Sequence, residues 1–343
     1  MSALGQKGQV VLKILTAVVP CYNSEDYMSR CIEALLTGGD AMEIIVVDDG
    51  SSDATGAIAD RYARENPQIV RAIHQPNGGH GAAINTGLAA ATGTYFKVVD
   101  SDDWLDPAAL QKALAILQTP TVDMLIANYV YDKVGKRHKR AMRYRHHLPE
   151  NRIFGWDNVH LPTGKYLLMH SVIFKTVILQ KMNLTLPRHT FYVDNLFVFE
   201  PLPHIQTMQY VDVDLYHYFI GRADQSVNEN VMIKRIDQQL RVNRDMITYY
   251  AQVKPANKRL DRYMRSYVAI VTGISSIVLL NDGSAESLAQ LRGLWHFMRV
   301  NDEPLYRSVR HSVVGRGINL PGRYGRQMTL SFYHLLQRFY SFN

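Results

Sequence analysis

Three carboxylates follow one strand-like run closely enough to act together. Over residues 95–104 a run of aromatic and β-branched residues ends in Asp100, Asp102 and Asp103. Open α/β sheets bind ligands beyond the carboxyl ends of their strands, and carboxylate oxygens are ligands that suit Mg²⁺ and Mn²⁺. The spacing therefore predicts a divalent metal site. The alternative is an acidic loop that only leads into a helix after Asp106.

A second polar stretch is glycine-rich, Asn77-Gly78-Gly79-His80-Gly81, and it precedes small residues that are typical of a helix. Backbone amides at the start of a helix can bind a phosphate. The stretch is neither a Walker A motif nor a GxGxxG fingerprint. Taken alone, it is only a weak indication of a phosphate-binding loop.

Strand-like and helix-like runs alternate around these stretches. Strands are expected at residues 12–19, 43–47, 70–74, 95–99, 123–133 and 210–220, and helices at residues 24–36, 54–64, 82–90 and 107–117. We expect Asn23 or Ser24 to cap the first helix. This alternation predicts an α/β fold, Rossmann-like, with a mostly parallel, doubly wound sheet whose strand ends lie along one edge.

The pattern changes to helical spacing from Val231 onward. We therefore expect a catalytic, nucleotide-binding domain at residues 1–227 and a helical C-terminal region at residues 228–343. The C-terminal helices could pair two chains in a homodimer or cover the sheet, and the sequence leaves both open.

Composition narrows the class of protein. With 343 residues, of which 47% are hydrophobic and 20% charged, the chain is typical of a folded globular protein. The net charge of +7 suits a polyanionic partner, a phosphate-bearing substrate or an anionic membrane surface, and it does not choose among them.

Cysteines and apolar stretches indicate the compartment. Cys21 and Cys31 form no CxxC pair, and we expect both to be small buried side chains in a reducing cytoplasm, with a single disulfide left open. The N-terminus lacks the apolar region of a secretory signal. The longest apolar stretch, residues 269–280, is shorter than the roughly 20 residues that span a bilayer, so we expect no transmembrane segment.

The end of the chain is basic and aromatic. Beyond Glu303 there is no acidic residue, while arginines recur and aromatic side chains gather over residues 330–340. Such a segment can lie in the interface of an anionic membrane. Packing on the surface of the protein itself explains the pattern equally well.

Four motifs occur in order at the ends of successive strand-like runs. They are Pro20-Cys21-Tyr22-Asn23, Asp48-Asp49-Gly50-Ser51-Ser52-Asp53, Asn77-Gly78-Gly79-His80-Gly81-Ala82-Ala83-Ile84-Asn85-Thr86-Gly87 and Asp100-Ser101-Asp102-Asp103-Trp104. These motifs closely resemble those of family 2 glycosyltransferases with the GT-A fold, of the bacterial cell-wall or exopolysaccharide type. The resemblance covers the first third of the chain densely, with scattered agreement to about Asn228.

The resemblance implies an inverting transferase that uses a UDP-sugar. By this analogy Pro20 and Tyr22 border the base, and Asp49 accepts a hydrogen bond from uracil. Asn77 and Asn85 line the donor pocket.

In the same resemblance Asp100-Ser101-Asp102 looks like the DXD motif. Asp102 would bind Mn²⁺ or Mg²⁺, and Asp100 would lie near the ribose or the waters of the metal. We expect Asp103 to cap a helix or to orient its neighbours.

The resemblance also implies an Asp that accepts the proton of the acceptor hydroxyl. Asp194, in Phe191-Tyr192-Val193-Asp194-Asn195-Leu196-Phe197, fits this position, although Val193 replaces the usual Glu. Capping of the following helix is the alternative role. Arg222 and Ser226 resemble a downstream element that closes over the diphosphate.

Histidines complete the candidate site. Their spacing matches no zinc motif, so a zinc site is not expected. We expect His80 near the donor, and His170 or Trp156 near the acceptor.

The sequence thus predicts a metal-assisted, inverting glycosyltransferase that moves a sugar from a UDP-sugar to an acceptor hydroxyl. The acceptor would be a lipid-linked glycan or a polysaccharide precursor, with the protein at the inner face of the membrane and without a nucleic-acid partner. A non-catalytic nucleotide-sugar-binding protein is the first alternative, which Val193 permits. A nucleotidyltransferase would need a glycine-rich basic signature after the first strand, which Pro20-Cys21-Tyr22-Asn23 does not supply.

Overall fold

A ten-stranded sheet forms the centre of the computed structural model, which describes residues 12–119, 121–133, 139–162, 164–220, 229–320, 322 and 324–331. The strand order is β3-β2-β1-β4-β9-β6-β10-β5, with β7 paired to β6 and β8 to β10. The strands are β1 (Leu15–Cys21), β2 (Met42–Asp48), β3 (Val70–His74), β4 (Tyr95–Val98), β5 (Trp104–Leu105), β6 (Met124–Lys133), β7 (Arg140–Met142), β8 (Ile153–Phe154), β9 (Val172–Lys175) and β10 (Met208–Ile220).

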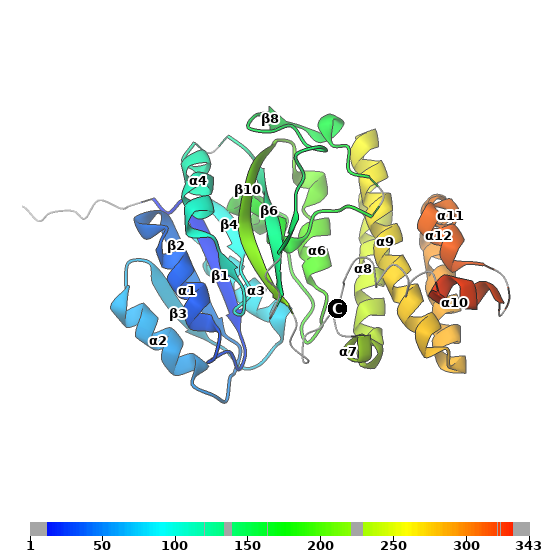
Figure 1. Cartoon of the computed structure of the whole chain (residues 1–343), viewed down its shortest axis with the longest axis horizontal. Helices are drawn as coiled ribbons and strands as arrows, with labels where there is room; N and C mark the ends of the chain where they lie inside the picture. Colours follow the sequence, from blue (N-terminus) through cyan, green and yellow to red (C-terminus); the bar gives the residue numbers. More distant parts are fainter. Residues whose placement is uncertain are drawn as a thin grey trace, which may run out of the picture.

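Helices surround the sheet and then continue as a separate layer. In Figure 1 the sheet fills the blue to green part, α8 and α9 stand beside it in yellow, and α10 to α12 lie beyond them. The helices are α1 (Met28–Leu36), α2 (Thr55–Glu65), α3 (His80–Ala90), α4 (Pro107–Leu117), α5 (Thr176–Lys181), α6 (Asp194–Phe199), α7 (Glu229–Lys234), α8 (Ile236–Val253), α9 (Lys258–Asp282), α10 (Ala285–Asn301), α11 (Glu303–His311) and α12 (Val313–Ile318).

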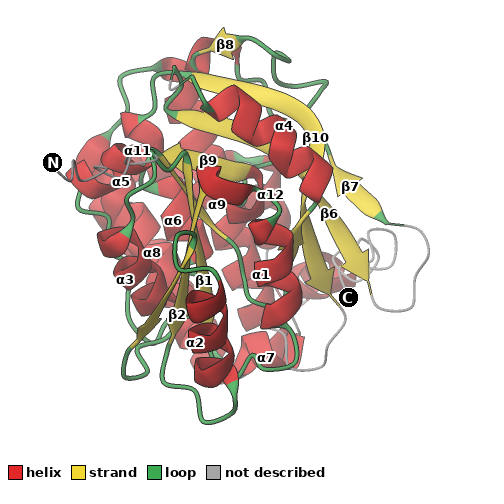
Figure 2. Cartoon of the chain, turned by 90° about the vertical axis from the view of Figure 1, so that its left-hand side faces the viewer, coloured by secondary structure: helices red, strands yellow, loops and turns green. Residues whose placement is uncertain are grey.

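The sheet is covered on both faces, as the sequence predicts. Val18 and Ile45 belong to one hydrophobic core, while their neighbours Ala17 and Ile44 belong to the other. This alternation is that of strands buried on both sides. Figure 2 shows α1 and α4 on one side of the strands and α3, α5 and α8 on the other.

Strand directions refine the expected sheet. The pairs β3/β2, β2/β1, β1/β4 and β6/β10 are parallel. Strand β9, which the sequence pattern did not predict, runs antiparallel between β4 and β6. The short β5 also runs antiparallel, against β10. The sheet is therefore mixed, with the candidate loops at the carboxyl ends of β1, β2, β3 and β4.

The start of α1 differs from the prediction. The helix begins at Met28, and neither Asn23 nor Ser24 caps it. The backbone N–H of Ser24 donates to Thr55 Oγ1 at 2.7 Å, and the Ser24 hydroxyl lies 2.8 Å from that of Ser101. Ser24 is thus held in a turn between two loops, which prevents the helix from starting there.

The C-terminal helices share a core with the sheet. One hydrophobic cluster includes Val18 and Phe96 of the strands together with Tyr263 of α9 and Trp295 of α10. The division between residues 1–227 and 228–343 therefore stays a prediction.

Helix α9 is long and apolar enough to cross a membrane, and it is the one helix with this property in the part of the chain that the structure describes. However, 72% of its apolar window is buried inside the structure. This burial is that of a core helix, held against α8 and α10.

Candidate active site

An ion pair joins the glycine-rich loop to the acidic loop. His80, the first residue of α3, places Nε2 2.8 Å from Oδ1 of Asp100, which follows β4. Burial lowers the pKa of His80, but the charge and hydrogen bond of Asp100 outweigh it and raise that pKa. Burial raises the pKa of Asp100, and His80 in turn brings it below its ordinary value. The two side chains therefore stabilise each other as a charged pair.

Asp103 anchors the acidic loop to β10. It is 1% exposed, and its two oxygens accept hydrogen bonds from the Tyr216 hydroxyl at 2.5 Å and from the Phe219 backbone N–H at 2.7 Å. Burial, followed by the charges of Asp102 and Asp100, raises the pKa of Asp103. Its place in the fold is that of a residue that orients its neighbours.

Helix capping falls to a different aspartate. The side chain of Asp106 accepts a hydrogen bond from the backbone N–H of Ala109 at 2.8 Å and caps α4. Ser101 and Asp102 are only partly buried at the strand end. The cap of α4 is therefore Asp106, as the acidic-loop alternative expects, and not Asp103.

Asp49 holds the glycine-rich loop in place. Its carboxylate accepts hydrogen bonds from the backbone N–H groups of Gly78 at 2.9 Å and Gly79 at 2.7 Å, and from Gln75 Nε2 at 2.6 Å. Gly79 adopts φ +83°, and a Cβ there would lie 2.9 Å from the backbone nitrogen of His189. The sequence predicted that the backbone amides of Gly78 and Gly79 could bind a phosphate. In the structure both amides donate to the carboxylate of Asp49 instead.

The other residues predicted to border the UDP-sugar differ in exposure and in hydrogen bonding. Tyr22 is 55% exposed at the end of β1, while Pro20 is buried within that strand. Asn77 Nδ2 donates to the backbone carbonyl of Asp49 at 3.0 Å. Asn85 uses both ends of its amide on the backbone of Leu186, at 2.9 Å each, so it fastens α3 to the chain before α6.

Asp194 begins α6 and faces the same ion pair. Val193 occupies the N-cap position, and no side chain caps the helix, so Asp194 does not have the alternative role of a cap. Burial raises the pKa of Asp194 to about 6, although the charge of His80 opposes this shift, and Asp100 adds to it. Asp194 is therefore coupled electrostatically to the His80–Asp100 pair, and the three residues come from three separate segments.

Trp156 and His170, the two residues expected near the acceptor, are both buried. The indole of Trp156 is 5% exposed, donates to the Ile205 carbonyl at 2.8 Å and stacks on Tyr263, so the expectation that it contacts an acceptor is wrong. His170 is buried between Tyr216 and Tyr218, with ring centroids 4.7 and 4.4 Å away.

Lys97 of β4 is a residue that the sequence pattern did not single out. It is fully buried, and its Nζ donates to the backbone carbonyls of His170 at 2.9 Å, Val172 at 3.3 Å and Met169 at 3.5 Å. Burial lowers the pKa of Lys97 to about 7. The one available signal was a lysine within an apolar strand, three residues before Asp100.

Two predicted residues, Arg222 and Ser226, lie outside the described residues, as do residues 332–343, which hold most of the aromatic stretch at the end of the chain. The predicted roles of these segments stay predictions.

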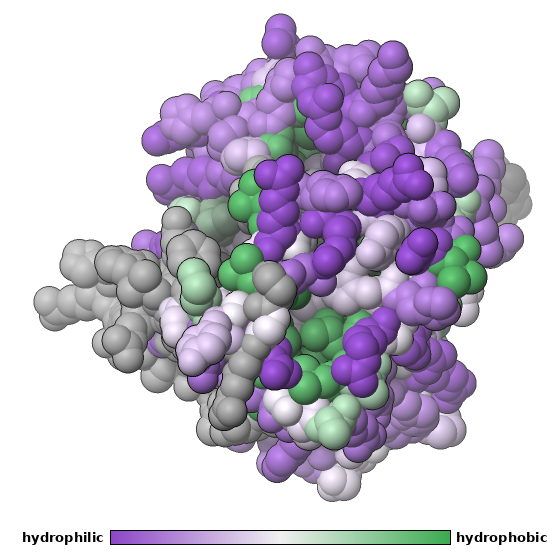
Figure 3. Space-filling view, turned by 90° about the vertical axis from the view of Figure 1, so that its right-hand side faces the viewer, coloured by the Kyte–Doolittle hydropathy of each residue, from purple (hydrophilic) through white to green (hydrophobic). Residues whose placement is uncertain are grey.

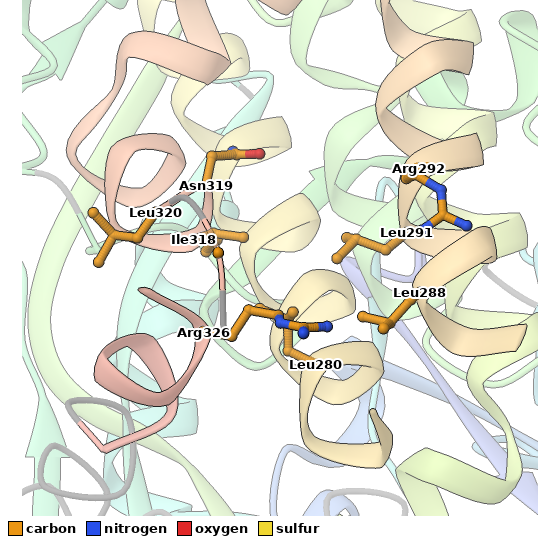
Figure 4. Close-up of a pocket in the computed structure, with 9 residues that line it drawn as sticks. Leu280, Leu288, Leu291, Arg292, Ile318, Asn319, Leu320 and Arg326 are labelled. Carbon is orange, nitrogen blue, oxygen red and sulfur yellow. The ribbon is translucent and has the colours of Figure 1, made fainter. Parts of the chain in front are cut away.

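An open groove lies in the C-terminal region, away from the strand ends. It has a volume of about 310 Å³, and Figure 4 shows leucine side chains and two arginines around it. Figure 3 shows this end of the molecule as a mostly hydrophilic surface with a small hydrophobic group in its lower part. The lining residues are Leu280, Leu288, Leu291, Arg292, Ile318, Asn319, Leu320, Gly322 and Arg326. None of the predicted site residues belongs to this groove.

Known proteins resemble this chain in sequence and in fold. Residues 16–178 match the family described as Glycosyl transferase family 2. Over 302 residues the chain is 27% identical to EpsH of Bacillus subtilis (strain 168), which is named as a glycosyltransferase, and the match covers 82% of this chain and 81% of EpsH.

Two solved structures support the same fold. S. aureus TarS 1-349 in complex with UDP-GlcNAc superposes with a TM-score of 0.67 at 18% identity, covering 96% of this chain and 91% of TarS. The mannosyltransferase PcManGT from Pyrobaculum calidifontis, in complex with GDP-Man and Mn²⁺, gives a TM-score of 0.51 at 15% identity, covering 94% and 85%. The fold is that of a GT-A protein. The part of the chain that matches family 2 glycosyltransferases, residues 16–178, is just under half of it.

Proposed function

We propose that this protein is an inverting glycosyltransferase that moves a sugar from a UDP-sugar to an acceptor hydroxyl, with Asp194 as the base. The observation that carries the proposal is that the charges of His80 and Asp100, an ion pair after the strand ends, act on the buried carboxyl of Asp194. Donor and acceptor would approach each other at this point.

In this proposal the loops after β1, β2 and β4 bind the UDP-sugar donor. Tyr22 presents an exposed ring for stacking on the uracil. Asp49 holds the glycine-rich loop in place through the backbone N–H groups of Gly78 and Gly79. The TarS structure is a complex with UDP-GlcNAc, and this supports a UDP-sugar as the donor here.

Asp100 and Asp102 fit a divalent cation, because they place partly buried carboxylates on one short loop. Such an ion, Mn²⁺ or Mg²⁺, would neutralise the charge that develops on the diphosphate as the glycosidic bond breaks. His80 adds a positive charge on the other side of Asp100.

Asp194 supplies the base on the acceptor side. The acceptor hydroxyl would lose its proton to Asp194 as its oxygen bonds to the anomeric carbon, while the bond from that carbon to the diphosphate breaks on the opposite face. UDP leaves with the electron pair of this bond, and the anomeric configuration inverts. A pKa of about 6 suits a base that works near neutral pH.

For the acceptor we propose a lipid-linked glycan or a polysaccharide precursor at the cytoplasmic face of a membrane. The net charge of +7 and the arginines beyond Glu303 favour an anionic surface.

Release of UDP tests the proposal. The purified protein is incubated with UDP-, GDP- and dTDP-sugars in Mn²⁺, Mg²⁺ or EDTA, and we expect slow, metal-dependent release of UDP from one UDP-sugar. UDP affinity is measured in parallel by calorimetry. Affinity without release, with glycan acceptors present, would favour the non-catalytic alternative, and absence of UDP affinity would contradict the whole assignment.

The rate should depend on pH through Asp194. Only the ionised carboxylate can accept a proton, so we expect a constant rate above about pH 7 and a decline of about tenfold per unit well below the pKa of about 6. Initial rates between pH 5 and 8, at saturating donor and metal, measure this profile. A rate that stays level down to pH 5 would show that a different group acts as the base.

A further inference from the structure

One imidazole lies against the acidic loop, and the mechanism proposed above does not use it. A ring nitrogen of His170 and carboxylate oxygens of Asp100 and Asp103 all lie within 4.8 Å of one another. His170 is 6% exposed, and its buried Nδ1 has no hydrogen-bond partner among the residues that the structure describes. A buried polar nitrogen without a partner is costly, which indicates that something else binds it.

The spacing of these three groups suits a metal ion. Donors on opposite sides of an octahedral ion with bonds of about 2.1 Å are about 4.2 Å apart. Small side-chain rotations would therefore bring atoms that lie within 4.8 Å onto one ion. The hydrogen bonds of Asp103 leave each of its oxygens with a further lone pair.

The surrounding structure holds His170 in place. Tyr216 and Tyr218 enclose the ring, and Lys97 fixes the backbone carbonyl of His170 itself. Lys97 donates to backbone carbonyls, and within the described part of the chain no ion pair joins it to Asp100 or Asp103. The two carboxylates therefore remain available to bind a cation. Lys97 is thus a positioning residue for the imidazole.

We propose that His170 is a direct ligand of the divalent cation at Asp100, so that the site has a mixed oxygen and nitrogen donor set and selects Mn²⁺ over Mg²⁺. Mg²⁺ prefers oxygen ligands alone, whereas imidazole nitrogen suits transition metals. The inference rests on the proposed function, since it deepens the metal site of the transferase.

Pulsed electron paramagnetic resonance of bound Mn²⁺ tests the proposal, because it detects coupling to a ligating ¹⁴N nucleus. The full chain is measured with Mn²⁺ and saturating UDP. We expect imidazole nitrogen coupling in the unchanged protein and its loss in His170→Gln. Mn²⁺ affinity should fall about tenfold or more in this variant, while Mg²⁺ affinity changes by less than about threefold.

His80→Gln is the matched control, because it removes the other imidazole beside Asp100. Nitrogen coupling should persist in this variant. Bound Mn²⁺ without nitrogen coupling in the unchanged protein, or coupling that survives in His170→Gln, would overturn the inference while UDP release still supports the transferase. Failure of Mn²⁺ to bind even with UDP would overturn the inference and the metal part of the proposed function together.

Discussion

Replacing Asp194 with asparagine is expected to cut turnover by a factor of about 10² or more, the usual size of a general-base contribution. Asparagine has nearly the same shape as aspartate but cannot accept a proton at neutral pH. Since Asp194 starts α6 on the acceptor side, UDP affinity should change by less than about twofold. Release of UDP from the preferred donor gives the turnover, and calorimetry gives the affinity.

Asp237→Asn is a suitable control for this change. Asp237 also lies in the first turn of a helix, α8, but unlike the buried carboxyl of Asp194 it is exposed to solvent. The control removes the same charge from a helix N-terminus, and its turnover should stay normal. Near-normal turnover in Asp194→Asn would remove Asp194 from the role of base, and an equal loss in both variants would attribute the effect to helix electrostatics.

Replacing Asp102 with alanine is expected to abolish the gain in UDP affinity that Mn²⁺ produces, a loss of about tenfold or more. The change takes one carboxylate from the predicted cation site, while Asp103 still ties the loop to β10. Calorimetric titrations with UDP in Mn²⁺ and in EDTA measure the difference.

Asp106→Ala, four residues further along, serves as the comparison. It removes the cap of α4 and should lower the free energy of unfolding by about 1 kcal/mol, with the Mn²⁺ effect intact. Urea denaturation measures this stability. Equal UDP affinity with and without Mn²⁺ in the unchanged protein, or a full Mn²⁺ effect in Asp102→Ala, would place the cation elsewhere.

Local signals in the sequence predict the early elements closely. Strand β3 and helix α4 have the predicted bounds, because turn residues flank the strand and Asp106 with Pro107 marks the start of the helix. The start of α1 was missed because Ser24 bonds to Thr55, 31 positions away. Strand β9 was missed for a similar reason, since its place between β4 and β6 depends on pairing that no local pattern encodes.

The sequence names candidate residues for the site but not the contacts that these residues make. The resemblance singles out Asp100 and Asp194, yet the electrostatic coupling between them across more than ninety positions depends on how the chain folds between them. The hydrogen bonds that occupy Asp49 and Asn85 could not be predicted either, because their partners belong to other segments. Packing thus decides which polar side chains face a ligand and which hold the protein together.

The continuous core beneath the sheet bears on how the chain comes to be folded on the ribosome. The apolar layer that contains Val18 of β1 also contains Leu240 of α8 and Leu294 of α10. Strand β1 leaves the ribosome early, and although α3 and α5 cover part of this face, α8 and α10 follow only some two hundred residues later. Part of this apolar face therefore stays exposed on the nascent chain during synthesis. The core is complete only when α8 and α10 have been made.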